Sequence, residues 1–249
     1  MAEAILRPGA VALVTGASSG IGEALAAMLV ERGVRVICAA REPKRLNAAV
    51  ARLGGGAHAL QLDVADPGST AGLLERLPEE LRAIDILVNN AGHDAGGRRL
   101  FHEGDIEDWA ATIETNVVGL IRVTHALVPG MLERGRGHVV NLGSVAGLRV
   151  FRNGSVYHAS KYAVRALTDA LRIDYADTDI RVTEVLPGLT RTGFAQARFH
   201  GDEAKGAAYY ERFPAAMAPE DVARAAIFAL EQPPHVTIAQ VVLVPTRET

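Results

Sequence analysis

The sequence predicts a single α/β domain over residues 1–249, built as a doubly wound parallel sheet of about seven strands with helices on both faces. Two observations lead to this prediction. Short, wholly apolar runs, typical of strands buried on both faces, alternate along the chain with longer segments of helical periodicity. A glycine-rich turn follows the first run, at the place where parallel sheets bind ligands beyond the carboxyl ends of their strands.

The first half of the chain is divided by glycine and proline. Ala10–Thr15 is a continuous apolar run and is the first expected strand. Gly20–Arg32 places Ile21, Leu25 and Leu29 on one helical face, and Gly33 ends this helix. Apolar runs and helical spacing then predict the strand Val34–Ala40, the helix Pro43–Leu53, the strand Ala57–Leu62, a helical stretch that ends near Leu81, and the strand Ile84–Asn89.

The second half repeats the alternation with longer helices. A long helix over Ile106–Arg134 precedes the strand His138–Leu142, and a helix over Ser155–Tyr175 precedes the strand Arg181–Leu186. Residues 188–218 are irregular, apart from a short helix near Glu203–Arg212, and form the expected substrate-binding segment. Pro219 begins the helix Pro219–Leu230, because proline is favoured in the first helical turn. Ala239–Val244 is the last expected strand.

Composition excludes several classes of function. The net charge is -3 and the basic residues are scattered, so we expect no nucleic acid or membrane partner. We find neither a secretory leader nor an apolar run long enough to span a bilayer. Cys38 is the only cysteine, which fits a reducing, cytoplasmic setting, and its apolar neighbours favour a buried core residue over a reactive thiol. The eight histidines lack metal-ligand spacing, so we expect no metal.

Between the first strand and the first helix lies Thr15-Gly16-Ala17-Ser18-Ser19-Gly20-Ile21-Gly22. Glycine lets the backbone turn tightly and approach a phosphate, and the following helix N-terminus offers free N–H groups and a positive dipole end. The turn therefore predicts a dinucleotide site, although a tight packing turn would also need glycine.

The spacing Gly-x-x-x-Gly-x-Gly resembles the short-chain dehydrogenase/reductase family, which has the Rossmann fold. The resemblance continues through nearly the whole chain: Asn89-Asn90-Ala91-Gly92 matches the motif after the fourth strand, and Pro187-Gly188 matches the turn after the sixth. The residues that match catalytic positions are Asn116, Ser144, Tyr157 and Lys161. The implied cofactor site comprises Gly16, Ser18, Ser19, Gly20, Ile21, Gly22, Arg41, Asp63, Val64, Asn90, Ala91, Gly92, Tyr157, Lys161, Pro187, Gly188, Thr190 and Thr192.

The end of the second strand predicts which cofactor is preferred. Enzymes that use NAD usually carry an acid there, which binds the ribose hydroxyls. This chain has Ala40 followed by Arg41, so no carboxylate at that position repels a 2′-phosphate and a guanidinium can pair with it. We therefore expect NADP(H), with a solvated loop charge as the alternative for Arg41.

Tyr157 and Lys161 are four residues apart and share one helical face. A nearby ammonium and an oxidised nicotinamide would favour the phenolate, so that Tyr157 takes the alcohol proton in oxidation and donates a proton in reduction. Ser144 can hold the substrate oxygen, or simply cap a turn. The resemblance implies that Lys161 also binds the nicotinamide ribose and that Asn116 holds a water linked to Lys161. A satisfied buried amide is the alternative for Asn116.

Within the family, Arg198-Phe-His-Gly-Asp-Glu-Ala-Lys205 and the ending Pro-Pro-His-Val-Thr-Ile look most like the NADP-dependent 3-hydroxy acid (serine-type) dehydrogenases. The resemblance implies a short hydroxy acid or a semialdehyde as substrate. Arginines suit such an anion, and we expect Arg152 or Arg198 to bind it, with Arg149 as a weaker candidate and His93 at the pocket rim. Solvated loop arginines are the alternative.

Two other functions remain open at this stage. One is a broad carbonyl reductase for apolar ketones, and the other is a dinucleotide-sensing protein without chemistry. The complete set of four catalytic positions argues against the sensor, because a binder does not need all four. The resemblance also implies a homotetramer that packs through the two long helices. The small residues Ala159, Ala163, Ala166 and Ala170 would permit close helix approach there, or would face the sheet.

Overall fold

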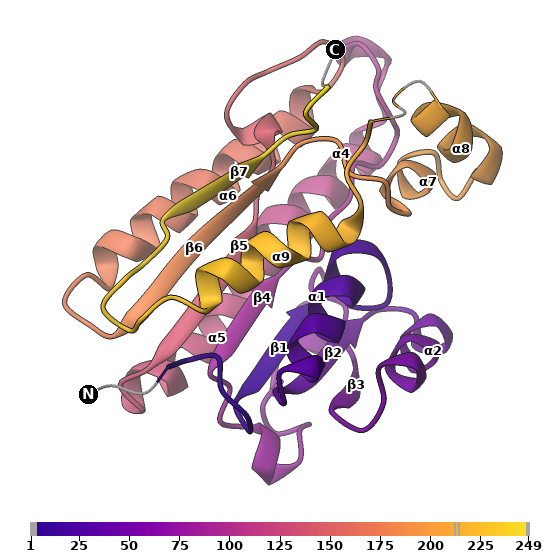
Figure 1. The fold of residues 1–249 in the computed structure, drawn as a ribbon. Helices are drawn as coiled ribbons and strands as arrows, with labels where there is room; N and C mark the ends of the chain where they lie inside the picture. The colour runs from indigo at the N-terminus through magenta and orange to yellow at the C-terminus, as the bar shows by residue number, and fades with distance from the viewer. Residues whose placement is uncertain (1–3, 212, 214, 248–249) are drawn as a thin grey trace.

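One parallel sheet forms the centre of the computed structural model, which describes residues 4–211, 213 and 215–247 (Figure 1). Its strands are β1 (Val11–Thr15), β2 (Arg35–Ala40), β3 (Ala57–Gln61), β4 (Ile86–Asn89), β5 (Gly137–Leu142), β6 (Ile180–Pro187) and β7 (Gln240–Leu243). Their order is β3-β2-β1-β4-β5-β6-β7, and all neighbouring pairs are parallel. The direction of winding reverses between β1 and β4, and this switch opens a crevice beyond the carboxyl ends of the strands. The predicted doubly wound sheet is confirmed.

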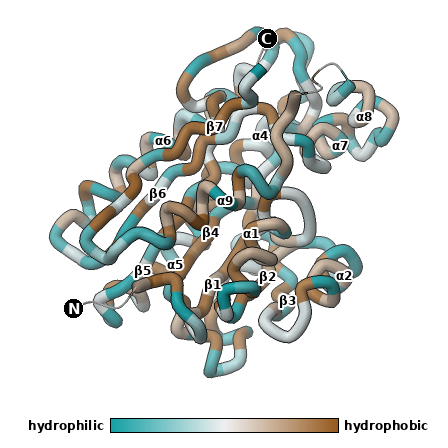
Figure 2. Tube along the Cα trace, in the orientation of Figure 1, coloured by the Kyte–Doolittle hydropathy of each residue, from teal (hydrophilic) through white to brown (hydrophobic). Residues whose placement is uncertain are grey.

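Each face of the sheet carries its own apolar core, because successive side chains of a strand point to opposite faces. Ala12 and Val14 join the core beneath α1 (Gly20–Glu31), α2 (Pro43–Leu53) and α9 (Pro219–Leu230). Val11 and Leu13 join the core beneath α5 (Leu120–Glu133) and α6 (Ser155–Asp174). Figure 2 shows the hydrophobic residues concentrated along the strands between these helices. Cys38 lies fully buried in the first core, as expected.

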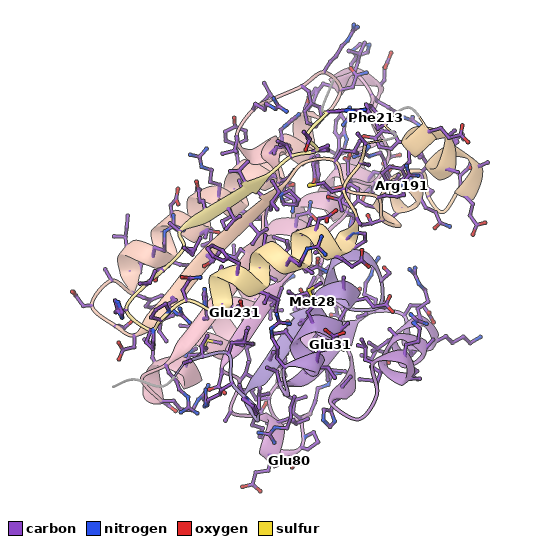
Figure 3. The ribbon with its side chains drawn as sticks, viewed as in Figure 1. Met28, Glu31, Glu80, Arg191, Phe213 and Glu231 are labelled. Carbon is purple, nitrogen blue, oxygen red and sulfur yellow. The ribbon has the colours of Figure 1, made fainter. Side chains whose placement is uncertain are left out.

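Helices α1 and α9 pack side by side, although their sequences are far apart (Figure 3). An ion pair between Arg32 Nε and Glu231 Oε1, 3.0 Å long, joins their carboxyl ends. This packing fixes α1 against α9, and the glycine-rich turn lies at the other end of α1, where Gly16, Ser18, Ser19 and Gly20 are half-buried.

The expected helix over Ile106–Arg134 is wrong as a single regular element. The structure divides it into α4 (Ile106–Ile113), a π-helical segment labelled η3 (Glu114–Gly119), and α5. Helical periodicity in the sequence does not distinguish these forms, because a single π turn leaves the apolar pattern on either side unchanged. Asn116 lies inside the π-helical segment. Such segments are frequent at functional sites.

The remaining short elements lie in the connections. The helical stretch expected to end near Leu81 consists of α3 (Pro67–Thr70), turns and η1 (Glu79–Leu81). The segment 188–218 contains two helices, α7 (Phe194–Arg198), which was not expected, and α8 (Glu203–Glu211). The predicted end of the second at Arg212 lies outside the described residues. Two further 3-10 turns are η2 (Phe101–Glu103) and η4 (Val145–Gly147).

Candidate active site

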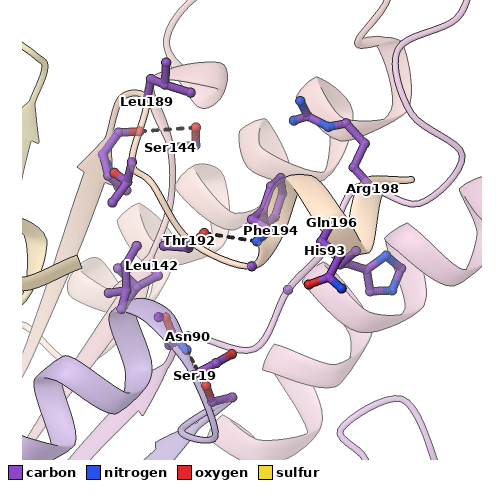
Figure 4. Close-up of a pocket in the computed structure, with 18 of the residues that line it drawn as sticks. Ser19, Asn90, His93, Leu142, Ser144, Leu189, Thr192, Phe194, Gln196 and Arg198 are labelled. Atoms are coloured by element: carbon purple, nitrogen blue, oxygen red, sulfur yellow. Dashed lines mark hydrogen bonds between the residues drawn. The ribbon is translucent and has the colours of Figure 1, made fainter. Parts of the chain in front are cut away.

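A cavity of about 1230 Å³ lies at the carboxyl ends of the strands and brings most of the predicted site residues together (Figure 4). One side, here called the glycine wall, consists of Gly16, Ser18, Ser19, Gly20, Ile21, Arg41 and Asn90. The opposite side, here called the arginine wall, consists of Arg98, Phe151, Phe194, Arg198 and Tyr209. Ser144, Tyr157 and Lys161 lie between the two walls and also line the cavity.

Glycine is required at three positions of the turn on the glycine wall. Gly16 and Gly20 have φ angles of 66° and 59°, which favour glycine. At Gly22 a Cβ would lie 2.4 Å from Asn90 Nδ2 and 2.6 Å from the Gly16 carbonyl oxygen. Ser19, the N-cap residue of α1, makes no side-chain capping hydrogen bond. The first amides of this helix therefore keep their donors for a ligand, which is what a dinucleotide pyrophosphate requires.

Thr15 and Asn90 hold the turn against β4. The Thr15 hydroxyl accepts from the backbone N–H groups of Asn90 and Ala91, both at 3.0 Å, and donates to the Val88 carbonyl at 3.3 Å. Asn90 Nδ2 donates to the Thr15 carbonyl at 2.9 Å. The predicted motif residue Asn90 therefore acts on the shape of the glycine turn, while Ala91 and Gly92 line the cavity beside it.

Arg41 lines the cavity beyond the end of β2, as the sequence predicts. A carboxylate, Glu42, lies beside it, and we missed its significance at the sequence level. Both oxygens of Glu42 accept backbone hydrogen bonds at the start of α2, from Lys44 N at 2.9 Å and from Arg45 N at 2.7 Å. These bonds lower the pKa of Glu42. The carboxylate is thus engaged as a helix cap, and Arg41 is free of an acidic partner among the described residues.

Tyr157, the predicted proton carrier, has one neighbour with a hydroxyl group and one with an amine. The Ser144 hydroxyl accepts from Ala146 N at 3.1 Å and donates to the Pro187 carbonyl at 3.4 Å, so it does cap a turn. It also hydrogen-bonds Tyr157, which lowers the pKa of that phenol, but burial dominates and raises the pKa to about 12. In the chain without a nicotinamide, burial therefore favours the phenol, and the expected phenolate, which also requires the oxidised nicotinamide, stays a prediction. Below that pH Tyr157 holds its proton and is a donor.

Lys161 is buried against the end of β5, where its Nζ donates to the Leu142 carbonyl at 2.8 Å and lies 5.9 Å from the Tyr157 ring centroid. Burial lowers the pKa of Lys161 to about 8, and the carboxylate of Glu184 acts against this shift. Glu184 is itself fully buried in β6, and its pKa rises to about 7. The two groups influence each other's pKa electrostatically, and no hydrogen bond joins their side chains in the described part of the chain.

Asn116 does not face Lys161 directly. Its Oδ1 accepts from the His93 N–H at 2.9 Å, and its Nδ2 donates to the His93 carbonyl at 2.9 Å and to Ser160 Oγ at 3.1 Å. The amide is thus satisfied and clamps the chain after β4. His93 lines the cavity, and burial lowers its pKa, so its ring is neutral. Its Nε2 contacts the Thr115 hydroxyl at 3.0 Å, whereas its Nδ1 lacks a hydrogen-bond partner in the described part of the chain.

The arginine wall brings together two guanidinium groups and three aromatic rings. Arg198 is buried, and its Nε lies 2.8 Å from Asp94 Oδ2. Its Cζ lies 5.4 Å from the Phe194 ring centroid and 5.0 Å from that of Tyr209. Arg98 faces the same Tyr209 ring and also stacks on a further ring of the wall. Sequence reasoning named Arg198 but missed Arg98, since a loop arginine that follows two glycines resembles a solvated charge.

The other predicted residues divide into two groups. Those that line the cavity are Val64, Gly92, Arg149, Pro187, Gly188, Thr190 and Thr192. Arg152 is exposed and Asp63 is half-buried, and both lie outside the cavity lining, as does Gly22, which acts through packing. His158 was not expected to matter. Its Nδ1 donates to the Ala146 carbonyl at 2.9 Å and its Nε2 accepts from Phe151 N at 3.0 Å, so it shapes the loop between Ser144 and Tyr157.

Among the described residues, no group of three or more His, Cys, Asp or Glu side chains is placed to hold a metal ion. In the same part of the chain, every helix is too short or too polar to cross a membrane.

Comparisons with known proteins agree with this geometry. A family model described as short chain dehydrogenase matches residues 10–203. The chain is 41% identical over 240 residues to the NADP-dependent 3-hydroxy acid dehydrogenase YdfG of Salmonella typhi, covering 96% of each protein. It is 37% identical over 241 residues to an NADP-dependent 3-hydroxy acid dehydrogenase of Schizosaccharomyces pombe, covering 95% of this chain and 92% of that protein.

Solved structures give the same picture. The closed form of serine dehydrogenase complexed with NADP+ is similar with a TM-score of 0.92 and 39% identity, covering 96% of each chain. Serine dehydrogenase from Escherichia coli is similar with a TM-score of 0.83 and 36% identity, covering 96% of this chain and 99% of that one.

Proposed function

The chain belongs to the short-chain dehydrogenase/reductase family, and from this premise we propose that it is an NADP(H)-dependent oxidoreductase acting on a short 3-hydroxy acid and its carbonyl counterpart. The observation that carries the proposal is the position of Ser144, Tyr157 and Lys161 between a phosphate-binding glycine turn and a pair of arginines in one cavity. A binding protein without chemistry would not need a half-buried tyrosine and a buried lysine at that point.

The glycine wall fits a dinucleotide. Its uncapped helix N-terminus suits a pyrophosphate, and Arg41 would pair with a 2′-phosphate. Thr192 and Lys161 would hold the nicotinamide end. When bound, the nicotinamide supplies or accepts the hydride. The rest of the chemistry belongs to the chain.

Tyr157 and Ser144 would share the substrate oxygen. In reduction the Ser144 hydroxyl orients the carbonyl, and the protonated Tyr157 donates its proton to the oxygen as the hydride arrives at carbon. Because the Tyr157 pKa is raised to about 12, this donor is fully protonated at neutral pH. In oxidation the proton must leave Tyr157, and the Lys161 ammonium and the positive nicotinamide favour that loss. Asn116 would position Lys161 through ordered solvent, as the resemblance implies.

The test is an assay of hydride transfer at 340 nm with short 3-hydroxy acids and the corresponding semialdehydes, each with NADP(H) and with NAD(H). We expect turnover of the acids with a marked preference for NADP(H). Faster turnover of apolar ketones would instead identify a broad carbonyl reductase. Tight NADPH binding without turnover of any carbonyl compound would identify a dinucleotide sensor.

We also propose a homotetramer, assembled through α4, α5 and α6, in the cytoplasm. Several apolar side chains on these helices are exposed, including Ile106, Ile121, Tyr162 and Ile173. Ala159, Ala166 and Ala170 are exposed on α6, so they face away from the sheet and permit close approach of a second copy. Light scattering tests the assembly, and a monomer at micromolar concentration would contradict it.

A further inference from the structure

We propose that Arg98 is the group that binds the substrate's negative charge, and that the cavity selects a substrate with a single carboxylate. This inference rests on the proposed function and deepens it, because it replaces the arginines expected from the sequence with one whose role only the fold reveals. It also limits the substrate's charge to one.

The contacts of Arg98 fix its orientation without using its hydrogen-bond donors. Its Cζ lies 4.3 Å from the Phe151 ring centroid and 5.8 Å from that of Tyr209. Rings attract a guanidinium through its flat face, whereas its N–H groups point outward in the plane. Within the described part of the chain, no carboxylate lies within ion-pair distance of Arg98. Its donors are therefore free to take an oxyanion in a bidentate pair.

Arg198 differs from Arg98 because its charge is already balanced. The Asp94 carboxylate lies 2.8 Å from Arg198 Nε, and both side chains are buried. Asp94 does not line the cavity, so it holds Arg198 from behind. The buried Nη1 of Arg198 lacks a hydrogen-bond partner among the described residues. Arg198 can thus add one donor to a bound carboxylate without adding net charge.

The charges on this wall predict the charge of the ligand. Asp94, Arg98 and Arg198 together carry +1, and Arg98, the one cation on this wall without a carboxylate partner among the described residues, lines the cavity although its side chain is exposed. A bound monoanion balances that charge, whereas a dianion leaves one negative charge unbalanced beside the buried pair of Asp94 and Arg198. Arg152, which the sequence also favoured, fits less well because it lies outside the cavity lining.

A series of contacts connects this anion site to Tyr157, the predicted proton carrier. The Tyr157 ring centroid lies 5.7 Å from that of Phe194, edge to face, and Phe194 in turn contacts Arg198. Both arginines lower the pKa of Tyr157, so their charges act at its hydroxyl. A small molecule therefore spans the distance from the anion site to the Tyr157 proton, in agreement with a short hydroxy acid.

The test compares 3-hydroxybutyrate with its methyl ester, using NADP+ and three variants. In the unmodified protein we expect the acid to exceed the ester about ten- to a hundredfold in kcat/KM, mainly through KM. Arg98→Ala should bring this ratio close to one, mainly by raising the KM of the acid. Arg98→Lys should restore part of the preference, because the charge returns without the bidentate geometry. The neighbouring exposed Arg99→Ala is the matched control and should keep the full preference.

A binding measurement keeps this test separate from the proposed function. Calorimetry of 3-hydroxybutyrate binding to NADP+-loaded Tyr157→Phe requires no turnover. Adding Arg98→Ala should weaken binding at least about tenfold, even if the reaction itself is of another kind. Unchanged binding and an unchanged acid preference in Arg98→Ala would overturn the role of Arg98 and leave the oxidoreductase assignment intact. Succinate binding more tightly than 3-hydroxybutyrate would overturn the limit to one charge.

Discussion

The glycine wall and the arginine wall face each other across one cavity but are held together by different forces. On the glycine wall, Asn90 and Thr15 bond to backbone atoms, and Gly22 allows the chain to pack without a side chain. On the arginine wall, Arg98 and Arg198 are held by ring faces and by one carboxylate. Backbone hydrogen bonds are short and directional, whereas cation–ring contacts tolerate a range of angles and distances.

This difference matches what each wall has to recognise. A dinucleotide presents the same phosphates and ribose in every reaction, so a rigid backbone site serves it. A substrate varies in length, and side chains on two loops and two short helices can adjust to it. We therefore expect changes on the glycine wall to affect stability and cofactor choice, and changes on the arginine wall to affect substrate choice.

The largest expected effect lies between the walls. Tyr157→Phe should lower kcat by about a thousandfold or more, because it removes the proton carrier and leaves the ring packed on Phe194. NADPH binding, followed by fluorescence, should stay within about twofold, since neither wall changes. Turnover close to that of the unmodified protein would refute the assignment of Tyr157.

Glu184, the buried carboxylate behind the cavity, is expected to affect the stability of the fold, as residues of the glycine wall do. Its pKa is raised from 4.5 to about 7 by burial in the folded chain. Between these values the folded state binds a proton that the unfolded chain releases, so stability falls as the pH rises from about 4.5 to 7 and then stays low. The difference is on the order of 3 kcal/mol.

Glu184→Gln should therefore raise the melting temperature at pH 8 and leave it nearly unchanged at pH 4.5, as thermal unfolding at the two values would show. Glu80→Gln, at an exposed residue, serves as a control and should show no such pH dependence. A lower melting temperature at pH 8 would mean that the Glu184 charge stabilises the fold through Lys161.

Arg41→Asp should alter cofactor choice and nothing on the arginine wall. Loss of a charge-assisted pair with the 2′-phosphate corresponds to about 2 kcal/mol, or roughly thirtyfold in kcat/KM for NADP+, and NAD+ use should improve. The preference for the acid over its ester should be the same as before. The same kcat/KM with both cofactors in the unmodified protein would exclude this role.

The smallest effect is expected from substitutions at two glycines, one near each wall. Together they compare the rigidity of the glycine wall with that of the arginine wall. A Cβ at Gly22 would contact Asn90 Nδ2 and the Gly16 carbonyl oxygen, so Gly22→Ala should cost about 1–2 kcal/mol even after the gain in helix propensity. Gly193, in the segment of the arginine wall, has open space and a φ of -65°. Gly193→Ala should shift the melting temperature little. Equal destabilisation by both would remove the contrast between the walls.

The sequence predicted the sheet well because its strands are buried on both faces, and such strands appear as unbroken apolar runs. All seven expected strands lie within about two residues of their observed positions at each end. The residues of the glycine turn were found for a similar reason. Their role depends on local backbone geometry, and glycine spacing in the sequence records that geometry directly.

The residues of the arginine wall could not be predicted from the sequence in this way. Asp94 and Arg198 meet from the loop after β4 and from α7, and no local pattern shows which loop side chains will face each other. Arg98 and Arg152 look alike in sequence and both are exposed, and only the fold places the first on aromatic rings that line the cavity and the second outside the cavity lining. The Tyr157 pKa also depended on burial, which outweighs the neighbouring charges.

Because Asn116 lies in a π-helical segment, the geometry of the site depends on the number of residues in that segment. A π turn takes up one residue more than an α turn, so the loss of a single residue here would restore regular α-helical geometry, leave α4 and α5 in phase, and move Asn116 from its present position on the helix. The clamp between Asn116 and His93 would then open although no contacting residue had been substituted. During evolution, a one-residue deletion between 114 and 119 should therefore be as damaging to this lineage as the loss of Asn116.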